Sequence, residues 1–176
     1  NWDGINWSQL GQNFNVTNNT QNAEHSNSIS LSSDGNTIAI GEKNAGNGGE
    51  VHVYFWDGSL WVQKGISIPG EQSQDLFGYS VSLSADGNTL AAGAIENNGS
   101  TTNISTQDIG HTRVFKWDGN SWVQFGQDFD GEYAIDYSGC SVSLNSAGTI
   151  LAIGAHHNTG STTSSGHVRV YDISSP

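Results

Sequence analysis

The chain has no methionine, one cysteine, two prolines and five basic residues, which stand against 17 acidic ones. The formal net charge of −12 disfavours nucleic acids and anionic membranes as partners, because both are bound through basic surfaces. Cys140 has no second cysteine for an intrachain disulfide, and no cysteine pattern typical of zinc sites is present. No apolar run approaches the roughly 18 residues of a membrane-spanning helix. Without a methionine Asn1 is not a translational start, so we expect a processed or excised chain.

The abundant residues are small, polar or aromatic. Charged residues make up 12% of the chain, which also contains 23 glycines, six tryptophans, five tyrosines and six phenylalanines. The aromatic side chains can build a core, and the low charge content excludes a charged disordered tail. A length of 176 residues fits a single domain.

Three sequence motifs recur in the same order along the whole chain. The first is Trp-Asp-Gly-x-x-Trp, which contains all six tryptophans and lies at residues 2–7, 56–61 and 117–122. The second is SISLSSDGNTIAIG, SVSLSADGNTLAAG and SVSLNSAGTILAIG, at residues 28–41, 80–93 and 141–154. The third is VHVYFW, TRVFKW and VRVYDI, at residues 51–56, 112–117 and 168–173. Residues 1–176 are therefore predicted to form a single repeat domain.

Each motif predicts β-strands. The second and third motifs alternate with a period of two, and Asp-Gly-Asn separates two such runs as in a hairpin turn. Trp-Asp-Gly ends a third strand and begins the turn to a fourth. The sequence thus predicts an all-β fold of three four-stranded antiparallel repeats, typical of β-propeller blades. We expect an outer strand at 1–10, a first blade at 11–64, a second at 65–125, and a third at 126–176 that lacks its outer strand.

The segments GYSVSLSADGNTLAAGA and GHTRVFKWDGNSWVQFG resemble the FG-GAP-like repeats of integrin-α-type propellers, in their extracellular variant. Phe77-Gly78 and Gly93-Ala94 match the two ends of the motif; Ser138-Gly139 and His25–Asn27 replace Phe-Gly in the third and first copies. The resemblance implies a propeller fold, whereas this family includes adhesion, carbohydrate-binding and structural modules. Its calcium ligands are not carried over, because the Asp86 turn offers one carboxylate and Ala147 replaces it in the third copy. No cofactor and no metal site are therefore predicted.

Three blades do not close a ring, and known propellers have about four or more. A second copy could add its N-terminal strand to the incomplete third blade, and two such exchanges would close a six-bladed dimer. The alternatives are a piece of a longer repeat protein and a head-to-tail fibre. The sequence leaves these possibilities open.

The candidate ligand-binding residues lie on the loops at one end of the predicted blades. Glu71 with Asp75, and Glu132 with Asp136, occur at the same offset before the first strand of a blade. The aspartates either accept backbone hydrogen bonds in the turn or hold a cation or polar ligand. His156 and His157 lie in an unrepeated long loop. Possible glycosylation sequons begin at Asn6, Asn15, Asn18, Asn98 and Asn103.

The repeats account for nearly all distinctive residues, and no catalytic constellation stands apart from them. We therefore expect a secreted, non-catalytic structural or adhesion module that associates with itself through exchanged or added strands. The alternative is a lectin-type propeller that binds glycans or extracellular matrix through its long loops and stacks tryptophans on sugars. In both cases the sequons indicate an extracellular protein.

Overall fold

The computed structural model describes residues 4–14, 27–99, 108–158 and 165–176. In these ranges the chain forms antiparallel sheets and no helix, so the all-β prediction is confirmed. Accordingly, no helix with the length and hydropathy needed to cross a membrane occurs in the described segments.

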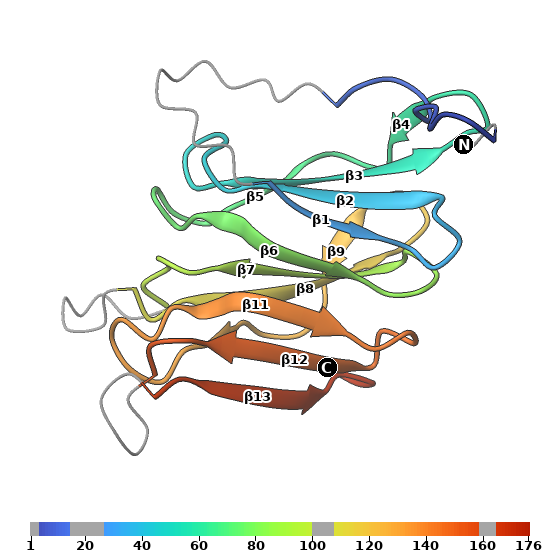
Figure 1. The fold of residues 1–176 in the computed structure, drawn as a ribbon. Coiled ribbons are helices and arrows are strands. Elements are labelled where there is room, and N and C mark those ends of the chain that lie inside the picture. Colours follow the sequence, from blue (N-terminus) through green and yellow to red (C-terminus); the bar gives the residue numbers. More distant parts are fainter. Residues whose placement is uncertain (1–3, 15–26, 100–107, 159–164) are drawn as a thin grey trace.

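Three sheets follow one another in chain order and are stacked face to face (Figure 1). The first contains β1 (Asn27–Leu31), β2 (Thr37–Glu42), β3 (Glu50–Trp56), β4 (Trp61–Gln63) and β5 (Ile68–Pro69). The second contains β6 (Phe77–Leu83), β7 (Thr89–Ala94), β8 (His111–Trp117), β9 (Trp122–Gln124) and β10 (Phe129–Asp130). The third contains β11 (Ser138–Leu144), β12 (Ile150–Ala155) and β13 (His167–Asp172).

The first two sheets contain the four predicted strands and one short addition each. β5 pairs with β3, and β10 pairs with β8, beyond the ends of the short outer strands β4 and β9. The repeated motifs do not predict these two short strands. In the third sheet β13 pairs with β12, and no described strand pairs with its other edge. Of residues 4–10, which lie in the predicted N-terminal strand, Trp7 alone makes a β-bridge.

The predicted turns form because side chains satisfy the backbone locally. In the β6–β7 hairpin the Asp86 carboxylate accepts from the Ser84 hydroxyl at 2.6 Å and the Asn88 amide at 3.0 Å. The Asp57 carboxylate accepts from the amides of Ser59 and Leu60, both at 2.7 Å, between β3 and β4. Such Asx turns reverse the chain through contacts between residues that are close in the sequence. In the assembled sheets the hairpin turns lie at one end, and the long connections lie at the other end (Figure 1).

The core consists of two apolar layers between consecutive sheets. Phe77, Leu90 and Val51 lie in the layer between the first and second sheets, and all three side chains are fully buried. Leu151 and Val114 lie in the corresponding layer between the second and third sheets. Because each layer needs two sheets, the outer faces of the first and third sheets have no apolar layer among the described residues.

Candidate functional site

Asp75 and Asp136 hold the connections that enter the second and third sheets. Oδ2 of Asp75 accepts hydrogen bonds from the amides of Glu71 and Gln72, at 3.1 and 2.7 Å. Oδ2 of Asp136 accepts from the amides of Glu132 and Tyr133, at 3.1 and 2.9 Å. Both aspartates are essentially inaccessible to solvent. The predicted alternative in which they cap a turn is confirmed.

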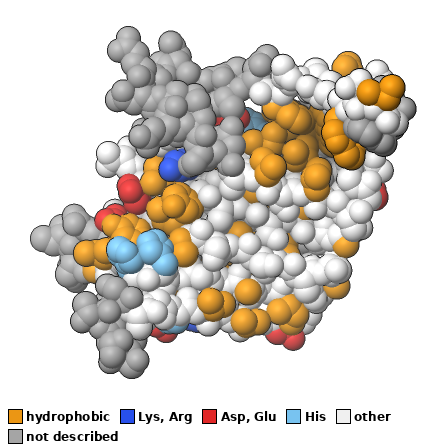
Figure 2. Space-filling model, viewed as in Figure 1, with side chains coloured by type: hydrophobic (Ala, Val, Ile, Leu, Met, Phe, Trp, Pro, Cys, Tyr) orange, Lys and Arg blue, Asp and Glu red, His pale blue; other side chains and the backbone are white. Residues whose placement is uncertain are grey.

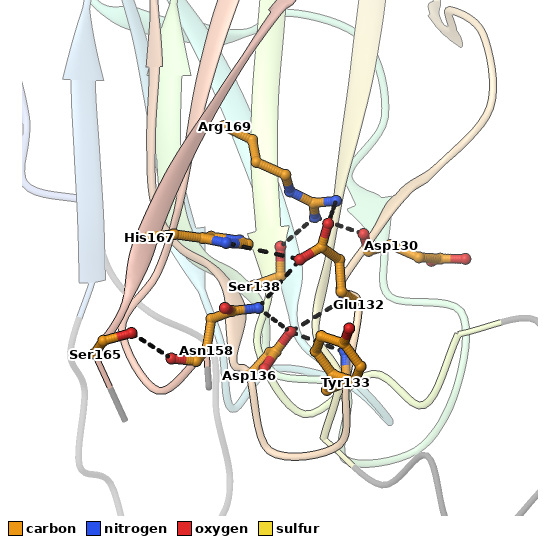
Figure 3. Close-up of polar contacts among 9 residues, drawn as sticks. All are labelled: Asp130, Glu132, Tyr133, Asp136, Ser138, Asn158, Ser165, His167 and Arg169. Carbon is orange, nitrogen blue, oxygen red and sulfur yellow. Dashed lines mark hydrogen bonds and ion pairs between the residues drawn. The ribbon is translucent and has the colours of Figure 1, made fainter. Parts of the chain in front are cut away.

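Around Asp136 the third sheet adds a polar cluster (Figure 3). The side-chain amide of Asn158 donates to Asp136 at 2.8 Å and to Glu132 at 3.3 Å. Glu132 also lies 3.7 Å from Nδ1 of His167 and 3.8 Å from the Arg169 guanidinium. Arg169 donates to the Asp130 carbonyl at 2.6 Å. These contacts join the connection that enters the third sheet to β13 and to the loop that follows β12.

The second sheet carries an equivalent cluster with a different composition. Arg113 donates to the Pro69 carbonyl at 2.7 Å and lies 3.6 Å from Glu71. Its guanidinium stacks on the ring of Phe77, 4.2 Å from the ring centroid. Arg113 and Arg169 therefore each contact both an acidic side chain and a backbone carbonyl. Nδ1 of His111 lies 3.7 Å from Oδ2 of Asp128, which precedes β10.

His111 is buried without a hydrogen bond. Its side chain is 1% exposed, and neither ring nitrogen has a hydrogen-bond partner among the described groups. Burial lowers its pKa to about 4, against the opposing effect of the Asp128 carboxylate. The imidazole is therefore neutral at pH 7.

We expect the free energy of unfolding to fall by about 3 kcal/mol between pH 7 and pH 4 through His111, because one pKa unit corresponds to about 1.4 kcal/mol. In this window the unfolded chain binds the proton and the folded chain does not. Urea unfolding at several pH values in metal-free buffer measures the slope. His111→Asn should flatten it; an unchanged slope would assign the pH dependence to other groups.

His156 and His157 lie at the long-loop end, where Figure 2 shows histidine beside hydrophobic side chains. The ring of Tyr137 stacks on His156 at 5.5 Å and meets His157 edge-on at 5.2 Å. Burial, with a contribution from His157, lowers the pKa of His156. The side chains of these two histidines are not drawn in the Asp136 cluster of Figure 3, although the backbone amide of His157 donates to the Asp136 carbonyl at 3.4 Å.

Two of the five sequon asparagines are described. Asn6 and Asn98 are both exposed, and Oδ1 of Asn98 accepts from the Asp108 amide at 3.0 Å. Asn15, Asn18 and Asn103 lie outside the described residues.

A shallow hollow of about 310 Å³ opens at the long-loop end. Its lining includes Lys43, Asn44, Gln74 and Glu96. Burial and the nearby Asp108 raise the pKa of Glu96. None of the described residues that line this hollow is aromatic.

At the turn end, each outer-strand tryptophan sits on the connection from the preceding repeat. The indole of Trp122 donates to the Lys64 carbonyl at 2.9 Å, and that of Trp61 donates to the Leu10 carbonyl at 3.0 Å. A Cβ on Gly65 would come 2.8 Å from the ring of Trp117, and one on Gly11 would come 2.6 Å from that of Trp56. We call each such place, at Leu10-Gly11 and at Lys64-Gly65, a tryptophan seat.

The third tryptophan seat, at Phe125-Gly126, holds no tryptophan among the described residues. A Cβ on Gly126 would meet only Pro176, at 4.0 Å. Instead a pocket of about 470 Å³ opens there, lined by residues that include Phe125, Gly126, Phe129 and Ile173. At this seat the structure therefore has a pocket, whereas a pair of indole rings covers each of the other two seats.

The N-terminal segment has the local structure of a connection between repeats. Gln9 donates to the Gly11 carbonyl at 3.3 Å and to Asn13 at 2.8 Å. Gln124 makes the same two bonds, to the Gly126 carbonyl at 3.5 Å and to Asp128 at 2.7 Å. The ring of Phe14 lies 4.8 Å from that of Tyr54, just as Phe129 lies 4.7 Å from Tyr171. Residues 9–14 thus correspond to residues 124–129.

The outer sheet faces expose positions that are buried elsewhere in the repeat. Val170 is 65% exposed, whereas its equivalents Val53 and Val114 are buried. On the opposite face of the stack, Ile29 is 65% exposed, whereas its equivalent Val81 is buried. Figure 2 shows hydrophobic side chains along the third sheet at the bottom of the view. The exposed residues are those that pack between sheets inside the stack.

The sequence motifs give no sign of a role for Asp128 or Asn158. The structure brings His111 and Asp128 to Glu71, and Asn158 to Glu132 and Asp136. The side chains of His156 and His157 contact Tyr137. The recurrence of Gly-His-x-Arg-Val at His111 and His167 was the one available signal.

No family model matches the chain, so the FG-GAP-like resemblance stays a prediction. No curated protein matches either. Among solved structures the chain is similar to TolB from Acinetobacter baumannii, with 17% sequence identity and a TM-score of 0.49. The match covers 85% of this chain and 30% of the TolB chain, so the chain spans less than a third of that protein.

Proposed function

We propose that the protein is a non-catalytic structural module, a three-bladed propeller segment that associates with a second copy of itself. The empty tryptophan seat at Phe125-Gly126 carries this proposal. Two seats in the same chain are occupied by tryptophans of the outer-strand hairpins. The third offers the same backbone and an apolar lining, and the N-terminal Trp-Asp-Gly-x-x-Trp hairpin is the segment that matches it.

The repeat register defines how that segment would add to β13. In the second sheet Phe115 faces Gln124 and Trp117 faces Trp122. The corresponding pairs would join Tyr171 to Gln9 of the second copy, and Ile173 to Trp7 of the second copy. Trp7 is 82% exposed, and its indole would reach the Phe125 carbonyl as Trp122 reaches that of Lys64.

The exposed faces supply the apolar contact for this association. Val168 and Val170 on the third sheet would pack against Ile29 and Leu31 of the second copy; all four side chains are between 55% and 68% exposed. Burying apolar area contributes roughly 25 cal/mol per Å². Making the contact at both ends of both chains closes a two-fold ring, in which the third sheet of each chain gains an outer strand from the other chain.

We expect the protein to sediment with the mass of two chains at micromolar concentration. Trp7→Ala and Val170→Lys should each return it to the mass of one chain with little change in unfolding free energy. Ile66→Lys changes another exposed apolar residue, 81% accessible, and should leave the dimer intact. A wild-type protein that sediments as one chain, or forms a ladder of sizes, would reject the closed dimer.

A lectin function through the long-loop end has weaker support. The hollow there offers polar groups around Glu96 without an aromatic platform. Trp56 and Trp61 pack against each other at 5.4 Å, and Trp117 and Trp122 at 5.5 Å. Trp61 and Trp122 are also held by indole hydrogen bonds at the turn end. An extracellular location is part of the proposal and rests on the sequons, of which Asn6 and Asn98 are exposed.

A further inference from the structure

Three potential metal ligands converge in the second sheet. Glu71 comes from the connection into the sheet, His111 from β8, and Asp128 from the segment before β10. One ligand atom of each lies within 4.8 Å of the other two. Among the described residues this is the one group of three acidic, histidine or cysteine side chains so arranged.

His111 supplies an observation independent of the carboxylates. Its side chain is 1% exposed, and its ring nitrogens make no hydrogen bond to the described groups. A buried polar atom without a partner costs stability unless something binds it. Its Nδ1 points toward the Asp128 carboxylate, 3.7 Å away.

Two of the three ligands are carboxylates, whose negative charge attracts a cation. Arg113 is the basic group beside them: it lies 3.6 Å from Glu71 and also contacts the Pro69 carbonyl and the Phe77 ring. Glu71 and Asp128 are partly exposed, at 38% and 28%, so both can adjust their rotamers.

We infer that Glu71, His111 and Asp128 form a binding site for one divalent transition-metal ion, such as Zn²⁺. An imidazole nitrogen with two carboxylates is a ligand set typical of Zn²⁺ and other divalent first-row transition metals, whereas Ca²⁺ prefers six to eight oxygen ligands. In a tetrahedron with bonds of 2.0–2.2 Å the ligand atoms lie about 3.4 Å apart. The distance of 3.7 Å between Nδ1 of His111 and Oδ2 of Asp128 is close to this value. A change in the Glu71 rotamer brings its carboxylate to a similar distance from the other two ligand atoms.

The third sheet contains the matched control. His167 and Glu132 lie 3.7 Å apart there, the same distance as between His111 and Asp128. The position equivalent to Asp128 would lie on an outer connection that is not present among the described residues of this sheet. The site is complete within one chain, and it is therefore independent of the proposed association.

Isothermal titration of the metal-free protein with Zn²⁺ tests the inference. We expect one strong site per chain, and a melting temperature that rises by several degrees in excess Zn²⁺, because the ion binds the folded state. Asp128→Asn and Glu71→Gln should each weaken binding at least tenfold, and His111→Asn should abolish it. Glu132→Gln should have no effect.

Two further measurements test whether the bound ion lies at this site and not at the exposed histidines. His156→Asn/His157→Asn removes the exposed histidine pair and should leave Zn²⁺ binding unchanged. The Co²⁺ complex should show the intense visible absorption of a tetrahedral site, and Asp128→Asn should weaken it. Absence of strong Zn²⁺ binding, binding that survives Asp128→Asn and Glu71→Gln, or binding lost with the exposed histidines would overturn the inference.

Discussion

Gly93→Ala should destabilise the protein by at least about 3 kcal/mol, because it forces two packed backbones apart. A Cβ built on Gly93 in β7 overlaps the carbonyl oxygen of Gly139 in β11, which belongs to the next sheet. The same carbonyl accepts a hydrogen bond from the Ser80 hydroxyl of β6 at 2.7 Å, so β11 cannot move away without losing that bond. Since domains of this size are stable by about 5–15 kcal/mol, urea unfolding should show a large loss.

Gly154→Ala is the matched control at the equivalent position of the third sheet. A Cβ there meets the Ser141 hydroxyl, which can rotate, and no backbone of a following sheet among the described residues. We expect a loss of about 1 kcal/mol or less. In the proposed dimer, however, Gly154 faces the second copy as Gly93 faces Gly139, so this variant should be folded and monomeric. Equal destabilisation by both variants would contradict this account of the interface.

Phe77→Ala should cost about 3–5 kcal/mol, the usual range for a buried phenylalanine. Phe77 is fully buried, and its ring lies 6.2 Å from that of Phe115 in an edge-on arrangement. It also supports the Arg113 guanidinium at 4.2 Å. Removing the ring leaves a cavity and deprives Arg113 of one face of its packing. Thermal and urea unfolding measure the loss.

Phe77→Leu separates the two contributions. Leucine fills most of the cavity but offers no ring face, so its cost should be well below that of alanine. The third repeat shows that the position tolerates another residue, because Ser138 occupies it. There the hydroxyl of Ser138 lies 3.5 Å from the Arg169 guanidinium, which donates to it. Equal losses of unfolding free energy in Phe77→Ala and Phe77→Leu would show that the cavity is not the cause of the loss.

The local features of the fold could be predicted from the sequence because neighbouring residues create them. Alternation in Ser-Val-Ser-Leu defines the strands β6 and β11. The carboxylate of Asp86 closes the β6–β7 turn, and that of Asp57 closes the β3–β4 turn. These contacts span two or three residues, so a sequence motif is sufficient. Counting motifs also predicted that β13 has no outer strand, and no described strand pairs there.

The candidate sites could be predicted only in part. Asp75 and Asp136 were identified because they recur at the same place in the repeat. Their carboxylates accept hydrogen bonds from backbone amides only three and four residues away. The Glu71–His111–Asp128 group was not identified, because each ligand belongs to a different segment and no motif joins them.

The sequence by itself determined three repeats, their strands, their turns and the tryptophan hairpins, since these depend on residue type and short spacing. Only the tertiary structure decided which of these positions end up buried, empty or clustered. Strand pairing places His111 between two connections that are distant in the chain, and no described tryptophan covers Phe125-Gly126. The physical reason is that burial and convergence depend on how sheets pack, and packing depends on all segments together.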